Sequence, residues 1–339
     1  MASVALGIHQ AMRNLGWTTA LACAIQPDGA ADDIGGRPRT SVMGAGTVVH
    51  VHGVWTAFEW RSCRWARQCG AALIVSPHGA LSPWARRKKW LKKTVAWHVY
   101  QRRALDAADL LLVNSREEAD DLAKLGLRPP IEILPNGIDV GAFPASNPQQ
   151  APRQKVIAYV GRFAEEKGLE DLLHAWSTLQ EKHGYSLHLH GFGDAAYVNK
   201  LTALERKLEL SSFLLGPPVF GKAKWDVLLG ARGFVLPSRT ESFGLAAAEA
   251  LFAGLPVVAT DAAPWGLLAP EGLGWSVPAD PSGIAEGLKR LMGIGDDQLV
   301  AMGRRAHAYA ASHFLWPEIA QRYRDICDRV TASRVARAA

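Results

Sequence analysis

Short apolar runs, many rich in β-branched residues, alternate along the chain with longer stretches in which apolar positions recur at helical spacing. This alternation is typical of an α/β protein, in which helices cover both faces of a parallel sheet. The apolar runs predict strands at residues 18–25, 47–51, 72–76, 110–113, 131–134, 155–160, 186–190, 212–215, 233–236 and 256–259. Helical spacing predicts helices at residues 3–16, about 296–312 and 316–330.

A segment rich in Pro, Gln, Asn and Ala separates the first five predicted strands from the last five. It runs from Gly141 to Gln154, and its composition favours an exposed linker. The length of 339 residues also favours two domains. We expect an N-terminal domain at residues 1–145, a C-terminal domain at 146–314, and a final helix at 315–339 that packs back on the N-terminal domain.

The composition, with 48% hydrophobic and 21% charged residues, is that of an ordinary globular protein. The chain has no long uncharged apolar window, and its N-terminus lacks the layout of a secretory signal, so we expect a cytoplasmic protein. The cysteines form no C-x-x-C pair and have no histidine at zinc-finger spacing. We expect them to be free thiols, mostly buried: Cys23, Cys63, Cys69 and Cys327.

The net charge of +6 is concentrated in residues 1–150, which hold 17 Lys and Arg against 12 Asp and Glu. Such an excess indicates an anionic partner; a nucleic acid is disfavoured because no base-stacking aromatic motif accompanies the charge. Most of it lies in SPWARRKKWLKKTVAWHVYQRR, residues 82–103. On one helix, an apolar stripe forms from Trp84, Leu91, Val95 and Val99. Residues 83–103 are either a helix that lies on an anionic membrane surface or a solvated helix packed by this stripe.

Five segments rich in Gly, His and charged residues directly follow or end predicted strands. They are VVHVHGVW (48–55), IVSPHGALSPWA (74–85), YVGRFAEEKG (159–168), LHLHGFGD (187–194) and VLPSRTESFGLAAAEAL (235–251). In open α/β sheets, ligands bind beyond the carboxyl ends of the strands. If the two domains face each other, all five loops line one cleft.

The loops of the second half have the chemistry of an anion site. Gly161 lets a ligand approach the backbone, and Arg162 and Lys167 can neutralise a diphosphate without a metal, although a solvated charge pair is the alternative. The Ala-rich helix predicted after Gly244 would direct its free N–H groups at an anion. Glu249 lies inside this helix and needs a polar partner, which is either a sugar hydroxyl or a neighbouring cation.

The order and spacing of these segments resemble the retaining glycosyltransferases of family 4. The likeness covers nearly the whole chain and rests on VGRFAEEKG (160–168), VLPSRTESFGLAAAEALFAGLPVVATD (235–261) with its two glutamates separated by seven residues, LLVNSREEADDLAKLG (111–126), ILPNGID (133–139) and FLWPEIAQRY (314–323). It implies a GT-B fold: two Rossmann-like domains whose parallel sheets face a central cleft, with the donor held mainly by the second domain. The implied donor is a UDP- or GDP-linked sugar, with no other cofactor and no metal.

The resemblance also implies roles for individual residues. Arg162 and Lys167 would bind the donor diphosphate, Glu241 would contact the transferred sugar, and Glu249 would contact the ribose. Donor phosphate would meet the backbone at Phe243, Gly244 and Leu245, next to the loop that carries Gly161. His78 matches a family histidine near the reacting carbon, and His52 is a second acceptor-side candidate; both could instead be hydrogen-bonded structural groups. No residue is recognisable as a nucleophile, so we expect front-face attack with retention.

Two features depart from the family pattern. Many members carry a Gly-Gly-x-x-Glu turn where this chain has Pro264-Trp265, which is similar to the subgroup that builds bacterial surface polysaccharides such as lipopolysaccharide. Trp265 is therefore an acceptor-side candidate that stacks on a sugar or fills a loop core. The family also begins with a strand and a Gly-rich loop before the first helix, and this N-terminal strand is expected to be missing here.

Three hypotheses follow for function. The leading one is a transferase that moves a hexose-type sugar to a saccharide or lipid-linked acceptor in cell-surface polysaccharide biosynthesis. The second is a GT-B sugar-nucleotide epimerase, and the third is a non-catalytic or truncated nucleotide-sugar-binding protein. A dehydrogenase is disfavoured because no G-x-G-x-x-G follows an early strand.

Overall fold

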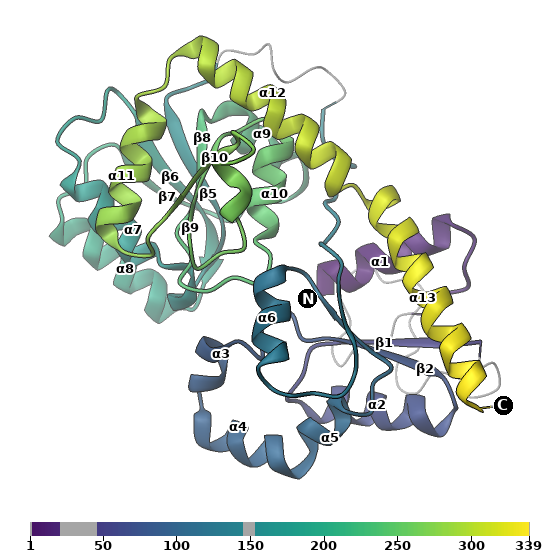
Figure 1. Cartoon of the computed structure of the whole chain (residues 1–339). Helices are drawn as coiled ribbons and strands as arrows, with labels where there is room; N and C mark the ends of the chain where they lie inside the picture. The colour runs from purple at the N-terminus through teal and green to yellow at the C-terminus, as the bar shows by residue number, and fades with distance from the viewer. Residues whose placement is uncertain (1, 21–45, 145–152, 339) are drawn as a thin grey trace. The chain divides into compact units, whose positions relative to one another are not determined.

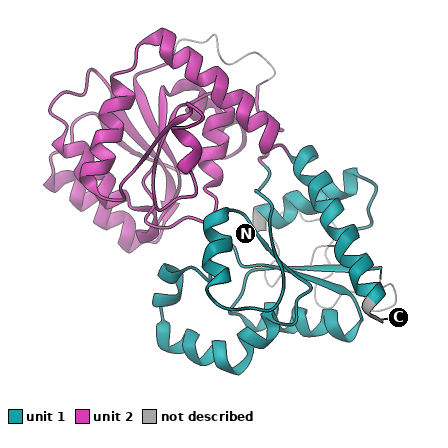
Figure 2. Cartoon of the chain, viewed as in Figure 1, with its two compact units in different colours: residues 1–137, 316–339 teal, residues 138–315 magenta. Residues whose placement is uncertain are grey.

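A computed structural model describes residues 2–20, 46–144 and 153–338 (Figure 1). The chain forms two compact units: unit 1 comprises residues 1–137 and 316–339, and unit 2 comprises residues 138–315 (Figure 2). Each unit contains a parallel sheet with helices on both faces, which confirms the predicted fold class. Among the described helices, none has the length and apolar character needed to span a bilayer.

The sheet of unit 1 has the order β1-β2-β3-β4, and all its pairings are parallel. Its strands are β1 (Val48–His52), β2 (Ala72–Ser76), β3 (Leu110–Val113) and β4 (Ile131–Ile133). Its helices are α1 (Ala2–Asn14), α2 (Ala57–Gln68), α3 (Pro83–Arg87), α4 (Trp90–Ala96), η2 (Trp97–Gln101), α5 (Arg102–Leu105), α6 (Arg116–Ala123) and α13 (Trp316–Ala338).

Alternate residues of β2 face two separate cores of unit 1, as the period of two in a strand requires. Ile74 packs with α1 and α13, where Ile319 is buried. Leu73 and Val75 pack on the other face with α2, whose Ala66 is fully buried. Burial on both faces explains why β2 is an unbroken apolar run in the sequence.

The sheet of unit 2 has the order β10-β9-β8-β5-β6-β7, again entirely parallel. Its strands are β5 (Val156–Phe163), β6 (Ser186–Gly193), β7 (Phe213–Gly216), β8 (Gly233–Leu236), β9 (Val257–Thr260) and β10 (Gly274–Val277). Its helices are η4 (Glu165–Lys167), α7 (Leu169–Thr178), α8 (Ala195–Lys207), α9 (Gly221–Gly230), α10 (Leu245–Phe252), η5 (Gly266–Leu268), α11 (Pro281–Met292) and α12 (Asp296–His313). The central strands β5 and β8 carry the loops of greatest interest.

The structure differs from the sequence prediction at strand β10 and at residues 18–20. The strand β10 was missed, because Gly274-Trp275-Ser276-Val277 is short and only half apolar. Residues 18–20 of the predicted strand at 18–25 form no strand, and the remainder of that prediction lies outside the described residues. The free-thiol prediction is confirmed for Cys63, Cys69 and Cys327, and Cys23 lies outside the described residues.

The basic run at 82–103 is not one helix. Helix α3 ends at Arg87, Lys88 is extended, and Lys89 takes a left-handed conformation with φ 54° before α4 begins. The break turns α3 away from the line of α4, so Trp84 does not continue the apolar stripe of Leu91, Val95 and Val99. The stripe itself is exposed.

Candidate active site

Lys167, predicted at the donor diphosphate, and Glu241, predicted at the transferred sugar, are in contact in unit 2. Lys167 ends η4 after strand β5, and Glu241 lies in the loop after β8. The Nζ atom of Lys167 lies 2.5 Å from Oε2 of Glu241, and the hydroxyl of Ser238 donates to the same oxygen at 3.3 Å. The sequence separated these two residues by 74 positions, and the parallel sheet brings them together at the carboxyl edge of its central strands.

Gly168 allows the loop that carries Lys167 to lie directly on the loop after β8. Its φ of +62° is in the left-handed region, and a Cβ atom there would lie 2.0 Å from the carbonyl oxygen of Pro237. The backbone N–H of Arg239 donates to the carbonyl of Glu166 at 2.9 Å. Glycine is required at residue 168 both for its backbone conformation and for this close approach.

Arg162 lies near the end of the strand that precedes η4, and its side chain has a different partner from that of Lys167. It lies within β5, where the hydroxyl of Tyr159 donates to its carbonyl at 2.9 Å. A Cβ atom on Gly161 would lie 2.8 Å from that hydroxyl, so glycine makes room for the tyrosine. The guanidinium of Arg162 is half exposed and pairs with Glu166. Its role at a diphosphate stays a prediction, because the guanidinium has to leave Glu166 to perform it.

Helix α10 begins directly after Gly244, as the sequence predicts, and the role of its N-terminus as an anion site stays a prediction. Gly244, with φ +82°, precedes the helix, whose first residue is Leu245. The N–H groups of the first turn of a helix have no acceptor within the helix and direct partial positive charge outward. Phe243 is buried, so it can offer a ligand only its backbone.

Trp265 fills the core beneath this helix terminus. Its side chain is 1% exposed, and its ring lies 5.9 Å from the rings of both Phe243 and Phe314. A Cβ atom on Gly244 would lie 2.8 Å from its indole nitrogen. Of the two interpretations of Trp265, the structure supports the loop core, because the buried ring offers no face on which a sugar could stack.

Glu249 is buried within α10 and pairs with a cation that the sequence analysis missed. Its Oε1 atom lies 2.6 Å from the Nζ atom of Lys224 in α9. Burial raises the pKa of the Glu249 carboxyl, and the charge and hydrogen bond of Lys224 oppose this rise. The alternative of a cation partner is therefore what the structure shows, and contact with a ribose stays a prediction. No spacing in the sequence indicates that Lys224, 25 residues away, is the partner.

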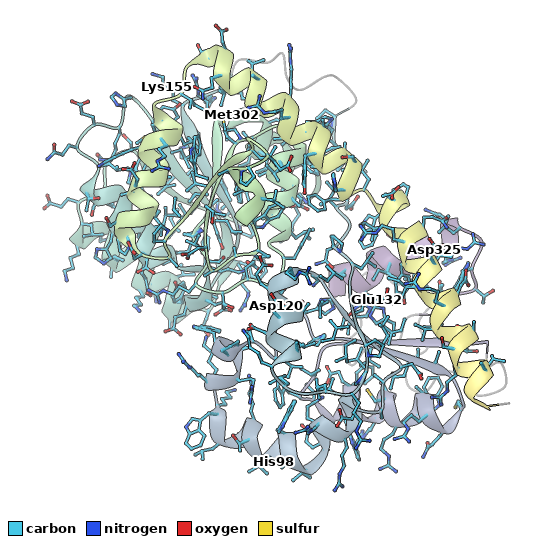
Figure 3. All side chains as sticks on the ribbon, in the orientation of Figure 1. His98, Asp120, Glu132, Lys155, Met302 and Asp325 are labelled. Carbon is cyan, nitrogen blue, oxygen red and sulfur yellow. The ribbon has the colours of Figure 1, made fainter. Side chains whose placement is uncertain are left out.

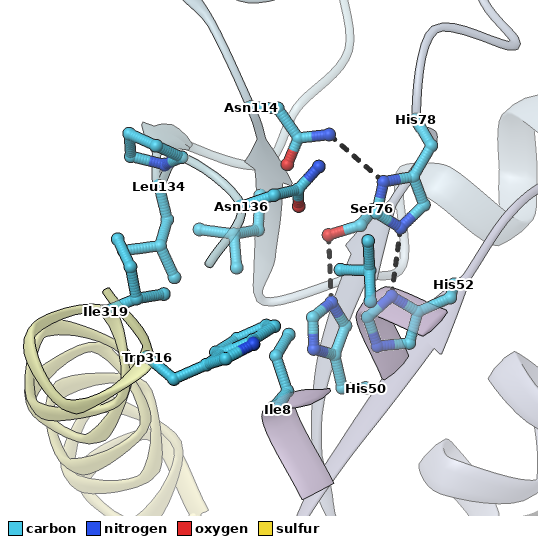
Figure 4. A pocket seen from close by; sticks show the side chains of 13 residues that line it. Ile8, His50, His52, Ser76, His78, Asn114, Leu134, Asn136, Trp316 and Ile319 are labelled. Atoms are coloured by element: carbon cyan, nitrogen blue, oxygen red, sulfur yellow. Dashed lines mark hydrogen bonds between the residues drawn. The ribbon is translucent and has the colours of Figure 1, made fainter. Parts of the chain in front are cut away.

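In unit 1, the two predicted histidines lie side by side in a small pocket at the carboxyl ends of β1 and β2 (Figure 4). Nδ1 of His52 lies 2.9 Å from Nε2 of His78, and the amide nitrogen of Asn114 donates to Nδ1 of His78 at 3.1 Å. With that donor, His78 carries its proton on Nε2 and donates it to His52. His78 has φ 52°, in the left-handed region.

A third histidine, which the sequence analysis did not select, lies against this pair. The ring centroids of His50 and His52 are 3.9 Å apart. His50 bonds Ser76 through Nε2 at 2.8 Å and the hydroxyl of Tyr323 in α13 through Nδ1 at 3.0 Å. Alternation along β1 places residues 50 and 52 on one face, which is the signal that could have found it.

Burial keeps all three imidazoles neutral. It lowers the pKa of His50 to about 3 and that of His78 to about 4, and it holds the pKa of His52 well below 6.5. The nearby histidines lower the values for His50 and His52 further. At neutral pH these rings therefore act as hydrogen-bond donors and acceptors without positive charge.

The lowered pKa values of these histidines predict that acid destabilises unit 1. A neutral His50 in the folded state and a protonated one in the unfolded state mean that stability falls as pH drops below about 6.5, toward the folded value near 3. Through His50 alone, the free energy of unfolding should fall by about 2 kcal/mol between pH 6.5 and pH 5. Urea unfolding at both pH values should show a shallower pH dependence for His50→Gln, whereas His183→Gln, at an exposed histidine, should match the unchanged chain. Equal slopes for all three proteins would contradict the assignment.

Glu118 ties the loops around the histidines together. It is 6% exposed, and its two carboxylate oxygens accept the N–H groups of Gly79 at 2.5 Å and Asn114 at 3.1 Å. Burial raises the pKa of its carboxyl, and the two hydrogen bonds oppose the rise. The carboxylate thereby fixes both Gly79, which follows His78 in the chain, and Asn114, which bonds the His78 ring.

In the part of the chain that the structure describes, no group of three or more His, Cys, Asp or Glu side chains is arranged to hold a metal ion. The histidines instead satisfy one another and Asn114, Ser76 and Tyr323.

Comparisons with known proteins agree with the geometry. Residues 154–293 match the family model for glycosyl transferases group 1, and residues 44–137 match that for the glycosyl transferase 4-like domain. The D-inositol 3-phosphate glycosyltransferase of Corynebacterium jeikeium is 31% identical over 244 residues, which are 66% of this chain and 58% of that protein. The GDP-mannose:cellobiosyl-diphosphopolyprenol alpha-mannosyltransferase of Xanthomonas campestris is 27% identical over 303 residues, 84% of this chain and 75% of that protein.

Solved structures share the fold. A glycosyltransferase from Rickettsia africae has a TM-score of 0.73 at 14% identity, covering 97% of this chain and 94% of that one. Sucrose-phosphate synthase from Thermosynechococcus elongatus has a TM-score of 0.68 at 23% identity, covering 84% and 74%. Together with the two family models and the named relatives, this fold shows that the chain belongs to the GT-B glycosyltransferases of the family 4 type.

Proposed function

We propose that the chain is a retaining glycosyltransferase that moves a hexose-type sugar from a UDP- or GDP-linked donor to a saccharide or lipid-linked acceptor in cell-surface polysaccharide biosynthesis. The observation that carries this proposal is the contact of Lys167, at the end of η4, with Glu241, in the loop that leads to the N-terminus of α10. A cation, a carboxylate and free backbone donors are the groups that a sugar diphosphate needs. The chain spans 58% of the length of the inositol phosphate relative, so its activity is proposed from these residues.

The donor would displace the ion pairs that now occupy the site. The diphosphate would take Lys167 from Glu241 and Arg162 from Glu166, and its oxygens would accept the first N–H groups of α10. The freed Glu241 would then accept hydroxyl groups of the sugar, and Glu249 those of the ribose. Because the two side chains supply the positive charge, the proposal needs no divalent metal.

Retention fits a front-face reaction. The acceptor hydroxyl would attack the anomeric carbon on the face from which the diphosphate departs, and its proton would pass to the leaving phosphate oxygen. The carbon–oxygen bond to phosphate breaks as the new glycosidic bond forms, so atoms and charges balance. Neutral His78, whose two ring nitrogens now bond Asn114 and His52, would exchange its hydrogen bond to His52 for one to the sugar and would add no charge.

We further propose that the acceptor is lipid-linked and that the chain works at the cytoplasmic face of the plasma membrane. Support comes from the Xanthomonas campestris relative, which is named for a diphosphopolyprenol-linked saccharide and GDP-mannose. The Anabaena protein HepE, solved with UDP and glucose, has a TM-score of 0.65 at 18% identity and supports the fold alone.

A donor panel tests the proposal. The purified chain is incubated with UDP- and GDP-linked hexoses, with and without a polyprenyl-diphosphate-linked saccharide, and the products are followed by NMR. We expect one donor to release its nucleoside diphosphate only with acceptor, and the product to keep the anomeric configuration of the donor. A sugar epimerised without acceptor would select the epimerase hypothesis, donor binding without turnover would select the non-catalytic one, and an inverted product would refute retention.

A further inference from the structure

Four large apolar side chains project into solvent from one helical segment of unit 1, and we call them the apolar ridge. They are Trp90, Leu91, Val95 and Val99, which are 60%, 63%, 63% and 63% exposed. Residues 91, 95 and 99 recur every four positions along α4 and η2, so they share one face of the segment. Isolated exposed apolar residues are ordinary, but adjoining ones mark an interaction surface.

The side of the segment opposite the ridge packs against unit 1. This packing makes the ridge face outward. Trp97 and Gln101 are buried, and the Gln101 side chain accepts the N–H of Trp55 at 2.8 Å. Figure 1 shows α4 at the outer margin of unit 1, and Figure 3 shows His98, which lies between Trp97 and Val99, at the same margin. The alternative in which the apolar stripe packs the helix onto the protein is therefore wrong.

Basic residues are concentrated in the part of the sequence that carries the ridge. Between Glu59 and Asp106 the sequence contains no Asp or Glu and eleven basic residues: Arg61, Arg64, Arg67, Arg86, Arg87, Lys88, Lys89, Lys92, Lys93, Arg102 and Arg103. Arg87, Lys88 and Lys89 directly precede the ridge, and Lys92 lies within it. The charges are close enough to act on one another, since the pKa of Lys93 is lowered first by burial and then by Lys88 and Lys89.

An anionic bilayer would bind both the apolar ridge and the cations beside it. Tryptophan and aliphatic side chains partition into the boundary between headgroups and acyl chains, and cations bind the anionic headgroups beside them. A nucleic acid would use the cations but would leave the aliphatic side chains exposed, because it offers them no apolar surface. The break at Lys89 separates α3 from α4, so the cations before the break can contact headgroups while the ridge enters the boundary region.

We propose that the apolar ridge of α4 and η2, flanked by the Arg87–Lys92 cations, docks unit 1 on an anionic lipid bilayer by inserting Trp90, Leu91, Val95 and Val99 into its interface. Its purpose rests on the proposed function, because the lipid-linked acceptor would be held at that surface. The docking itself requires neither donor nor acceptor.

Vesicle co-sedimentation of the full chain tests the docking. Vesicles of phosphatidylcholine with phosphatidylglycerol should bind the chain, pure phosphatidylcholine should bind it far less, and added salt should release it. Arg87→Gln with Lys92→Gln should weaken binding about thirtyfold, and Leu91→Ser with Val95→Ser about tenfold. A blue shift of tryptophan fluorescence on binding should accompany insertion.

Matched controls separate the ridge from general effects. Lys207→Gln with Lys289→Gln removes two exposed cations from unit 2, and Val300→Ser with Val335→Ser removes two exposed apolar side chains from other helices; neither pair should change binding. Equal binding to neutral vesicles, or no effect of the ridge variants, would overturn the proposal, as would binding to RNA in place of vesicles. If the chain does not bind vesicles but transfers sugar to a soluble acceptor, the proposed function stands and the docking is refuted. If it binds vesicles but transfers no sugar, the docking stands and the proposed function is refuted.

Discussion

Replacing Lys167 by methionine is expected to lower kcat/KM for sugar transfer about a thousandfold. Methionine keeps most of the length of the side chain but removes the charge that would meet the phosphate as it departs. Removing one preorganised group of this kind costs 10²–10³ or more in rate. The Glu241 carboxylate, which is largely buried, would also remain without the cation that it now contacts and would repel the diphosphate. Steady-state kinetics with the donor found by the panel would measure the loss.

Lys200→Met is the matched control, because it removes a lysine that also pairs with a carboxylate in unit 2. The Nζ atom of Lys200 lies 2.6 Å from Glu170, on the α7–α8 side of the sheet. We expect its kcat/KM to stay within about twofold of the unchanged chain, with both variants equally folded by circular dichroism. If Lys167→Met were no slower than Lys200→Met, the anion site proposed at η4 and the α10 terminus would be wrong.

The elements of both sheets could be predicted because burial on two faces leaves a simple trace in the sequence. Runs such as Leu110–Val113 and Val257–Thr260 are wholly apolar or nearly so, and length with β-branching then favours a strand. The strand Gly274–Val277 escaped because it lies at the edge of its sheet and alternates apolar with small polar residues. The break after Arg87 escaped because neither Gly nor Pro marks it; Lys89 takes the left-handed conformation instead.

The sequence predicts which loops form the site but not how their side chains pair. Gly161, Gly168 and Gly244 indicate close backbone approach, and the geometry at Gly168 shows why. The partners of the charged groups could not be predicted, because they depend on contacts between distant segments. His50 and Tyr323 are 273 positions apart, and only the packing of α13 against the sheet of unit 1 brings them together. A single cleft lined by loops of both units stays a prediction.

Glu249→Gln is expected to weaken donor binding about a hundredfold while leaving the fold intact. Glutamine keeps the shape of the side chain, but it loses the charge that strengthens hydrogen bonds to the two ribose hydroxyls, each worth about 1.5–3 kcal/mol. Isothermal titration with the nucleoside diphosphate alone would measure the change, since the ribose belongs to that part of the donor. Glu132→Gln, which weakens an exposed ion pair with Arg329 in unit 1, should leave affinity unchanged.

Lys224→Met separates the two roles open to Glu249. If Glu249 serves only as the ion-pair partner of Lys224, removing either residue should have the same effect on nucleotide affinity, and the double variant should be no worse than either single one. If Glu249 binds the ribose, the lysine competes with the nucleotide for the carboxylate, and Lys224→Met should retain or improve affinity while Glu249→Gln loses it. Because burial favours the protonated form of Glu249 and Lys224 opposes this, the affinities are compared over a range of pH, and the difference between the two variants should appear at the higher values, where the carboxyl is charged without the lysine. Identical losses in the two single variants would remove Glu249 from the donor site.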